Sequence, residues 1–344
     1  MKRHLKRLLL LLGAGFLLAG GFAAWMAWFA FAAVPLKLNP QGVVDFDIRP
    51  RLGLKGAAQA MAAAGIGIPP WQFALLGRLA GKDRNIQAGS YEVGANGEQI
   101  TAWQLLQKLT YGDVTQTKMV IVEGKTFRDL RAQLDAHPDL RHDTAGLTDT
   151  EILALIGANE SHPEGLFFPD TYLFARQSKD LLILQRAYHG MQRRLADAWE
   201  NRDPSVPYKS PREALIMASI VEKETGAPAD RGKVASVFVN RLRIGMLLQT
   251  DPTVIYGLGT SFDGNLRKRD LLADTPYNTY TRGGLPPTPI ALPGMASIQA
   301  ALNPPTTDLY YFVAKGKGSE GASVFSRNLE EHNRAVNKYQ RGGK

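Results

Sequence analysis

Two glutamates, Glu222 and Glu224, end a mostly apolar segment that runs from Ala214 to Gly226. Pro211 before it and Pro228 after it are typical of the start and the stop of a helix. Apolar residues occur all round this predicted helix, so we expect it to be buried on most faces. An apolar wall favours the protonated form of a carboxyl group, which is the form that a glycosidic general acid needs. Glu222 is therefore a candidate acid, and the alternative is a glutamate that simply reaches water from the helix end.

Glu224 is an alternative candidate for the general acid and does not form a pair with Glu222. Two positions along a helix turn a side chain by about 200°, so Glu222 and Glu224 should face opposite ways. Paired glycosidase carboxylates face each other across about 5–9.5 Å, which this spacing does not allow. One of the two must be chosen, and the sequence offers Glu222 no facing partner.

Four motifs downstream concentrate amide, hydroxyl and phenol groups. They are Val237–Leu242, Leu248–Gly257, Tyr277–Tyr280 and Gly283–Ile290. Such groups in loops suit sugar recognition, in which rings stack and amides bridge hydroxyls. The alternative is turn chemistry, because Asp-Pro, Gly-Gly and Pro-Pro are turn signals by themselves.

Taken together, these segments resemble a known family. Ile220–Thr225, Leu248–Gly257, Tyr277–Tyr280 and Leu285–Pro287 are similar to motifs of the YceG-like (MltG) endolytic murein transglycosylases. The resemblance covers about residues 45–335 and includes the N-terminal apolar segment. It implies Glu222 as the catalytic acid/base and no cofactor. It implies a substrate cleft containing Asn240, Gln249, Asp251, Tyr277, Asn278 and Tyr280.

The chemistry that this resemblance implies is lytic. Glu222 would protonate the oxygen of the MurNAc–GlcNAc β-1,4 bond of a glycan strand. The resulting carboxylate would take the proton of the C6 hydroxyl of the same MurNAc, closing a 1,6-anhydro ring. Because that nucleophile belongs to the substrate, one carboxylate suffices. The alternatives are a conventional muramidase with two carboxylates and a membrane-anchored peptidoglycan-binding scaffold without catalysis.

An uncharged apolar segment precedes all of these motifs. The 27 positions of Leu8–Val34 carry no charged residue, and as a helix they would reach about 40 Å, enough to cross a bilayer. Four cations come before it, so the positive-inside rule predicts a cytoplasmic N-terminus and an extracytoplasmic remainder, at the inner membrane. Trp25 and Trp28 lie toward the outer end. A cleaved signal peptide is the alternative, although its apolar core would run only about 7–15 residues.

Composition limits the other function classes. The chain has 344 residues, 44% hydrophobic residues, a formal charge of +9 and no cysteine, which excludes disulfides and thiolate chemistry. No cationic run with interleaved aromatic residues appears after the apolar segment, so we expect no nucleic-acid partner. Six scattered histidines without His-Glu-x-x-His give no metal motif. Gly316–Gly321 matches Gly-x-Gly-x-x-Gly, but a strand-like segment follows it, so we interpret it as a hairpin loop.

The expected fold class is α+β with four parts. Residues 1–7 form a cytoplasmic tail and 8–34 a transmembrane helix. Residues 35–115 form a linker and a small unit with the order strand, helix, helix, strand, helix, which the resemblance identifies as LysM-like. Residues 116–344 form a larger mixed catalytic domain, in which we expect Thr126 to cap a helix and residues 147–200 to be mostly helical. The expected partners are glycan strands, the membrane and, by resemblance, enzymes of wall synthesis.

Overall fold

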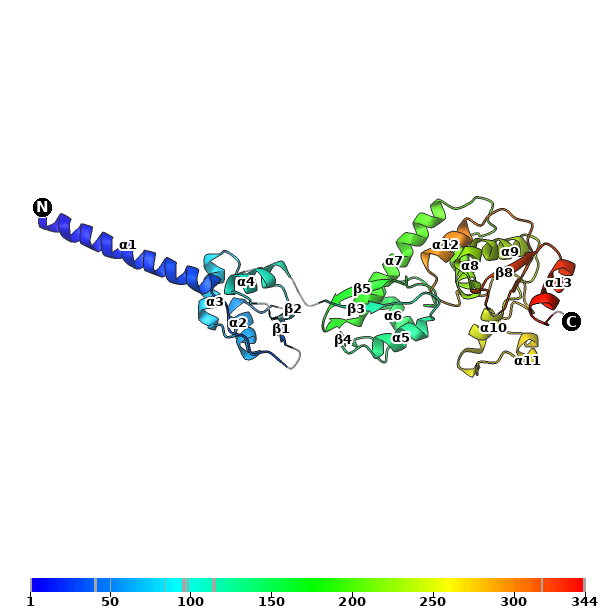
Figure 1. Ribbon diagram of the computed structural model, residues 1–344, viewed down its shortest axis with the longest axis horizontal. Helices are drawn as coiled ribbons and strands as arrows, with labels where there is room; N and C mark the ends of the chain where they lie inside the picture. Colours follow the sequence, from blue (N-terminus) through cyan, green and yellow to red (C-terminus); the bar gives the residue numbers. More distant parts are fainter. Residues whose placement is uncertain are drawn as a thin grey trace. The chain divides into compact units, whose positions relative to one another are not determined.

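The structure is a computed structural model that divides into two compact units (Figure 1). It describes residues 2–39, 42–49, 51–83, 85–94, 97, 99–112, 116–316 and 318–342. Unit 1 comprises the chain up to Thr117 together with Leu173–Ser178, and unit 2 comprises Lys118–Tyr172 and Lys179–Lys344. The predicted domain limit between residues 115 and 116 falls at 113–115, which lie outside the described residues, so that limit stays a prediction.

Unit 1 has the predicted order of strand, helix, helix, strand, helix. Its elements are α1 (Lys2–Phe31), β1 (Val44–Ile48), α2 (Leu54–Ala63), α3 (Pro70–Leu79), β2 (Gly89–Val93) and α4 (Ala102–Tyr111). β1 and β2 pair antiparallel, and every second residue of β1 is buried. Phe46 and Tyr91 stack in the core with ring centroids 5.4 Å apart. α4 begins with a capping box, in which Thr101 and Gln104 each bond the other's backbone N–H.

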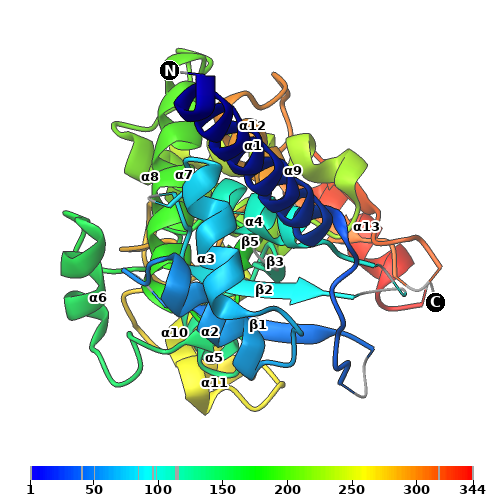
Figure 2. The same ribbon diagram turned by 90° about the vertical axis from the view of Figure 1, so that its left-hand side faces the viewer.

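The apolar N-terminal helix continues into this core. Met26, Phe29 and Ala30 are buried in it, and α1 ends at Phe31, three residues before the predicted limit. After the helix, the chain is fixed by a bond from Val34 N to the carbonyl of Ile100, at 2.8 Å. Within the described residues, one helical segment, Leu12–Phe31, has the length and hydropathy of a membrane span. Figure 2 shows α1 lying against the side of unit 1 that carries α3 and α4.

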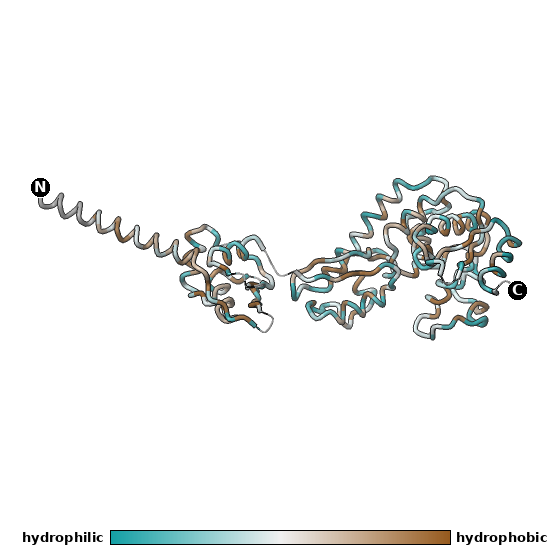
Figure 3. Tube along the Cα trace, in the orientation of Figure 1, coloured by the Kyte–Doolittle hydropathy of each residue, from teal (hydrophilic) through white to brown (hydrophobic). Residues whose placement is uncertain are grey.

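Unit 2 is richer in helices. Its helices are α5 (Phe127–Asp135), α6 (Asp149–Ile156), α7 (Asp180–Glu200), α8 (Pro211–Glu224), α9 (Arg231–Arg243), α10 (Asp251–Leu258), α11 (Lys268–Leu272), α12 (Met295–Leu302) and α13 (Leu329–Tyr339), with 3-10 turns at Pro228–Asp230 and Gly259–Ser261. Figure 3 shows hydrophilic and hydrophobic residues mixed along these helices, as expected for helices with one buried face. α8 lies at the centre, packed against α12, α9, α7 and α10.

The strands after β2 form three two-stranded sheets. They are β3 (Gln116–Val120) with β5 (Thr171–Ala175), β4 (Leu140–Arg141) with β6 (Ser178–Lys179), and β7 (Tyr311–Ala314) with β8 (Ser323–Ser326). The β7–β8 pair is antiparallel, which confirms the hairpin predicted around Gly316–Gly321, although Lys317 lies outside the described residues. β5 and β6 fall in a region predicted to be mostly helical. In β5, Tyr172 and Phe174 alternate with outward-facing residues, which is a strand pattern that we missed.

Candidate functional site

α8 is buried as its sequence predicts. The Ser210 hydroxyl accepts a hydrogen bond from Glu213 N at 3.3 Å and caps the helix, whose first residue is a proline. Every residue from Ala214 to Val221 is buried. Ser219 is fully buried but satisfied, because its hydroxyl donates to the carbonyl of Ile216 and accepts from Ile290 N. The two glutamates at the end of the helix therefore project from a rigid support.

Glu222 and Glu224 leave α8 in different directions, as their spacing predicts. Glu222 Oε2 accepts a hydrogen bond from Gly294 N at 3.0 Å, at the start of α12. Glu224 Oε1 accepts a hydrogen bond from the Thr250 hydroxyl, at the start of α10. Each carboxylate thus has its own surroundings, and the two do not form a pair.

A cavity of about 670 Å³ lies at Glu224. Three of the predicted cleft residues, Gln249, Asp251 and Tyr280, line it. Its other walls come from α9, the β7–β8 hairpin and α13; they include Arg241, Tyr311, Phe312, Gly321, Ser323 and His332. A polar cavity with aromatic walls has the composition of a sugar-binding site.

The surroundings of Glu224 favour the protonated form of its carboxyl group. Its burial raises the pKa of Glu224, and the nearby charge of Asp251 raises it further, against the lowering effects of the Thr250 hydroxyl and Arg241. Asp251 in turn accepts a hydrogen bond from the Tyr280 hydroxyl. Gln249, in the wall of this cavity, has a backbone φ of 50°, a conformation that residues other than glycine seldom adopt. Strain of this kind often marks functional positions.

Arg241 holds the walls of this cavity together. The residue is 7% exposed, and its Nε donates to the carbonyl of Tyr310 at 2.7 Å. Its Nη1 donates to the carbonyl of Leu248 at 2.6 Å, and the guanidinium lies 5.3 Å from the centroid of the Tyr311 ring. One side chain therefore connects α9, the segment before Gln249 and the β7–β8 hairpin.

Two of the predicted cleft residues point into the protein. Asn240 Nδ2 donates to the carbonyls of Thr307 and Leu309, both at 3.0 Å. Asn278, 1% exposed, donates to three backbone carbonyls, and its own oxygen accepts from Tyr280 N. These bonds give both asparagines a positioning role: Asn278 orients the loop that carries Tyr280. Their contact with substrate stays a prediction.

Glu222 has an acidic neighbour that comes from far along the chain. Burial raises the pKa of Glu123, and the charge of Glu222 raises it further while Arg231 lowers it. A Cβ built on Gly294 would lie 1.8 Å from Glu123 Oε1, so this carboxylate lies directly over the glycine whose N–H binds Glu222. The sequence placed no facing carboxylate near Glu222; the tertiary structure supplies one.

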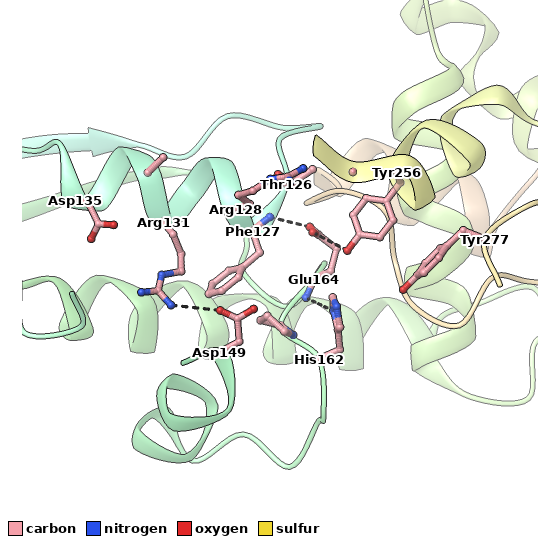
Figure 4. Close-up of a pocket in the computed structure, with 13 residues that line it drawn as sticks. Thr126, Phe127, Arg128, Arg131, Asp135, Asp149, His162, Glu164, Tyr256 and Tyr277 are labelled. Atoms are coloured by element: carbon pink, nitrogen blue, oxygen red, sulfur yellow. Dashed lines mark hydrogen bonds and ion pairs between the residues drawn. The ribbon is translucent and has the colours of Figure 1, made fainter. Parts of the chain in front are cut away.

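A second cavity, of about 590 Å³, contains the remaining predicted residue, Tyr277 (Figure 4). The Tyr277 ring lies 5.0 Å from the ring of Tyr256, and its hydroxyl is 2.9 Å from that of Thr288. Between the cavity and the core lies Glu164, 3% exposed, which accepts from Phe127 N at 2.9 Å and from the Tyr256 hydroxyl at 3.1 Å. The cleft motifs therefore contribute to two cavities, one at each end of α10.

Glu164 should make the stability of unit 2 depend on pH. Burial raises its pKa from 4.5 to about 7, so the folded state binds this proton more tightly than the unfolded chain does. The resulting stabilisation is fully present below pH 4.5 and is lost as the pH rises through about 7, by at most about 3 kcal/mol. In Glu164→Gln the amide oxygen still accepts from Phe127 N, while the amide N–H can donate to the Tyr256 oxygen. We expect this variant to flatten the dependence in urea unfolding between pH 4.5 and 8. The exposed control Glu330→Gln should follow the wild type; equal slopes for all three proteins would contradict the prediction.

One group of possible metal ligands occurs among the described residues. Oxygen and nitrogen atoms of Asp135, His142 and Asp180 lie within 4.8 Å of one another. Asp180 is fully buried, and its two oxygens already accept bonds from the Thr144 backbone and hydroxyl and from Leu181 N. This bonding gives Asp180 a structural role that the sequence did not reveal.

Comparison with known proteins gives consistent similarities. The model of the YceG-like family matches residues 46–338. A Bacillus subtilis protein named endolytic murein transglycosylase is 37% identical over 270 residues, which cover 74% of this chain and 73% of that protein. A Streptococcus pneumoniae D39 protein of the same name is 31% identical over 180 residues, 50% of this chain and 31% of that longer protein. The crystal structure of a yceG-like protein from Listeria monocytogenes, 30% identical, covers 86% of this chain and 99% of its own, with a TM-score of 0.54.

Proposed function

The chain belongs to the YceG-like family, and we propose that it is a membrane-anchored peptidoglycan lytic transglycosylase that cuts glycan strands internally. The observation that carries this proposal is the cavity at Glu224. It brings a carboxyl group of raised pKa together with Gln249, Asp251 and Tyr280. A carboxyl group of raised pKa in a polar, aromatic-lined cavity is what general acid catalysis with an internal nucleophile requires.

The proposed reaction uses one carboxyl group twice. The protonated acid gives its proton to the oxygen of the MurNAc–GlcNAc β-1,4 bond, and this bond breaks with an oxocarbenium-like transition state. The carboxylate then takes the proton of the C6 hydroxyl of the same MurNAc, whose oxygen bonds to C1. The products are a 1,6-anhydro-MurNAc end and a free GlcNAc end, and no water is consumed.

Two glutamates compete for this role. The motif resemblance assigns it to Glu222, which stays a prediction and whose carboxylate lies beside Glu123 and Gly294. The geometry favours Glu224, because the predicted cleft residues Gln249, Asp251 and Tyr280 share its cavity. We therefore propose Glu224 as the acid/base and Glu222 as the alternative.

Product analysis tests the function. Purified full-length protein in detergent is incubated with uncross-linked glycan strands, and the products are separated and weighed by mass spectrometry. We expect fragments with 1,6-anhydro-MurNAc ends and a rapid fall in mean strand length, since the cuts are internal. Reducing MurNAc ends would indicate a hydrolase with two carboxylates, with Glu123 and Glu222 as its candidate pair. Intact strands that bind to the protein would favour the non-catalytic scaffold.

The remaining parts of the proposal concern location and partners. We propose that α1 crosses the inner membrane with its cationic N-terminus in the cytoplasm, so that both units are extracytoplasmic. By resemblance, we propose that unit 1 is a LysM-like glycan-binding unit. By the same resemblance, we propose that enzymes of cell-wall synthesis are partners of the protein. Tethering near the bilayer would favour cuts in newly made strands. A form lacking residues 1–24, which keeps Met26, Phe29 and Ala30 in the core of unit 1, should then alter the strand-length distribution in cells, and an unchanged distribution would count against the tether.

A further inference from the structure

α3 of unit 1 has apolar residues on two opposite faces. One face is buried in the core of the unit; it contains Phe73, Ala74, Leu76 and Gly77. The other face contains Trp71, Leu75 and Leu79, spaced four residues apart, so that they lie in one row along the helix. Trp71 is 59% exposed and Leu79 62% exposed, while Leu75 is half-buried between them. A helix with apolar residues on two opposite faces is normally covered on both, so something should cover this row.

The neighbour of this row is the membrane helix. The Trp71 ring stacks on the ring of Trp25 in α1, with centroids 5.8 Å apart and an interplanar angle of 24°. In Figures 1 and 2, α3 lies beside the end of α1. The next residues of α1, Met26, Phe29 and Ala30, are buried in the core of unit 1. The positions of α1 and α3 are therefore fixed relative to each other.

The depth of Trp25 in the bilayer follows from the length of the helix. Arg7 is the last cation before the apolar segment, so the hydrocarbon core begins near Leu8. About 20 helical residues cross such a core, which brings the chain to its outer boundary near Ala27. Trp25 lies at this boundary, where tryptophan is enriched in membrane proteins. Trp71, stacked on it, must lie at the same depth.

The edge of the row has charges that suit a lipid headgroup. Arg78 is exposed in the last turn of α3, beside Leu79. Lys82 follows the helix, with its Nζ 4.7 Å from the centroid of the exposed Tyr111 ring. Long cationic side chains beside tryptophan and leucine are typical of helices that lie in the membrane interface.

We propose that the row Trp71–Leu75–Leu79 of α3 lies in the outer headgroup region of the bilayer, as a second membrane contact besides α1. This inference rests on the proposed anchoring by α1. Because α1 is packed into unit 1, the helix and the unit tilt together in the bilayer. A second contact beside the first restrains unit 1, and so sets the direction in which the chain leaves the bilayer.

The absence of cysteine makes the test direct. Single cysteines are introduced into the full chain at Leu79, at Gly15 within the span and at Arg49 directly after β1, and each is labelled with an NBD fluorophore. The proteins are reconstituted in vesicles of phosphatidylcholine and phosphatidylglycerol with and without a nitroxide group on the acyl chain near the headgroup, which quenches NBD at short range. Figure 1 shows β1 on the side of unit 1 away from the free length of α1, so Arg49 is the matched exposed control.

We expect quenching at Gly15→Cys and Leu79→Cys and none at Arg49→Cys. Quenching at Gly15 alone would overturn the second contact and leave the anchor intact, whereas no quenching at Gly15 would refute the anchor itself. Loss of quenching at Leu79 as protein is concentrated in the vesicles would show that a second copy of the chain covers the row, which also overturns the proposal. A label at Trp71→Cys repeats the test if Leu79→Cys fails to fold.

Discussion

Glu224→Gln is expected to abolish the release of 1,6-anhydro products while the protein stays folded. Glutamine keeps the size of the side chain and still accepts from the Thr250 hydroxyl. It cannot donate a proton to the glycosidic oxygen or take one from the C6 hydroxyl. General acid–base assistance contributes about 10²–10⁴-fold, so turnover should fall by at least this factor. Rates on uncross-linked strands, measured by mass spectrometry of the anhydro ends, provide the test.

Glu222→Gln is the matched control, because it lies two residues away on the same helix end. Its amide oxygen still accepts from Gly294 N, and the charge repulsion with Glu123 is removed. We expect it to retain activity. The reverse result, with Glu222→Gln inactive and Glu224→Gln active, would return the catalytic role to the residue that the motif resemblance selects. Unchanged thermal unfolding of both variants would show that the comparison concerns chemistry.

The pH dependence of the rate gives a second readout of the same assignment. Because burial and Asp251 raise the pKa of Glu224, its acid form persists to higher pH than that of an exposed glutamate. Turnover should decline as the pH rises through this pKa. Asp251→Asn removes the negative charge that helps to raise the pKa of Glu224. This variant should therefore move the decline in turnover to lower pH.

Arg241→Met is expected to give the largest loss of stability of any change in the cavity wall. Methionine fills much of the same volume but leaves the carbonyls of Tyr310 and Leu248 without their donor. Each buried acceptor without a partner costs about 1–3 kcal/mol, a large share of the about 5–15 kcal/mol that stabilise a domain. Urea unfolding followed by circular dichroism measures the loss. Arg269→Met is the control, since the Arg269 side chain is 77% exposed and should cost little.

Arg241→Met should also reduce turnover beyond its effect on folding. The bonds of its guanidinium fix the segment that leads to Gln249, so their loss should displace this part of the cavity wall. A variant that is destabilised but fully active at low temperature would show that Arg241 supports the fold without positioning the site.

Local features could be predicted from the sequence because short-range physics determines them. Thr126 was predicted to cap a helix, and the structure contains the capping box that it forms with Asp129. The order of elements in unit 1 followed from hydrophobic periodicity and turn residues. The hairpin around Gly316–Gly321 followed from a strand on each side of a glycine-rich loop. β5 was missed because its strand pattern is short and lies between helical segments.

The candidate site could not be predicted from hydrophobic periodicity alone. The sequence showed that Glu222 and Glu224 must face opposite ways, because helix geometry alone fixes this. It did not show what each faces, because Thr250, Asp251 and Tyr280 reach Glu224 from segments that follow it by about 25 to 55 positions. Asn240 and Asn278 resemble sugar-binding amides in the sequence, yet they bind backbone carbonyls. Their roles depend on which carbonyls the fold leaves without partners.

The two glutamates at the end of α8 show which features the sequence determined and which features depended on the tertiary structure. The sequence determined that a buried helix ends in two opposed glutamates, and that an uncharged helix precedes them, because both are properties of neighbouring residues. The tertiary structure decided that Glu224 opens into the cavity of the cleft motifs while Glu222 meets Glu123 across Gly294. It also placed Trp71 against Trp25, a contact between residues 46 positions apart. Such contacts follow from packing, because only the folded chain brings these distant segments together.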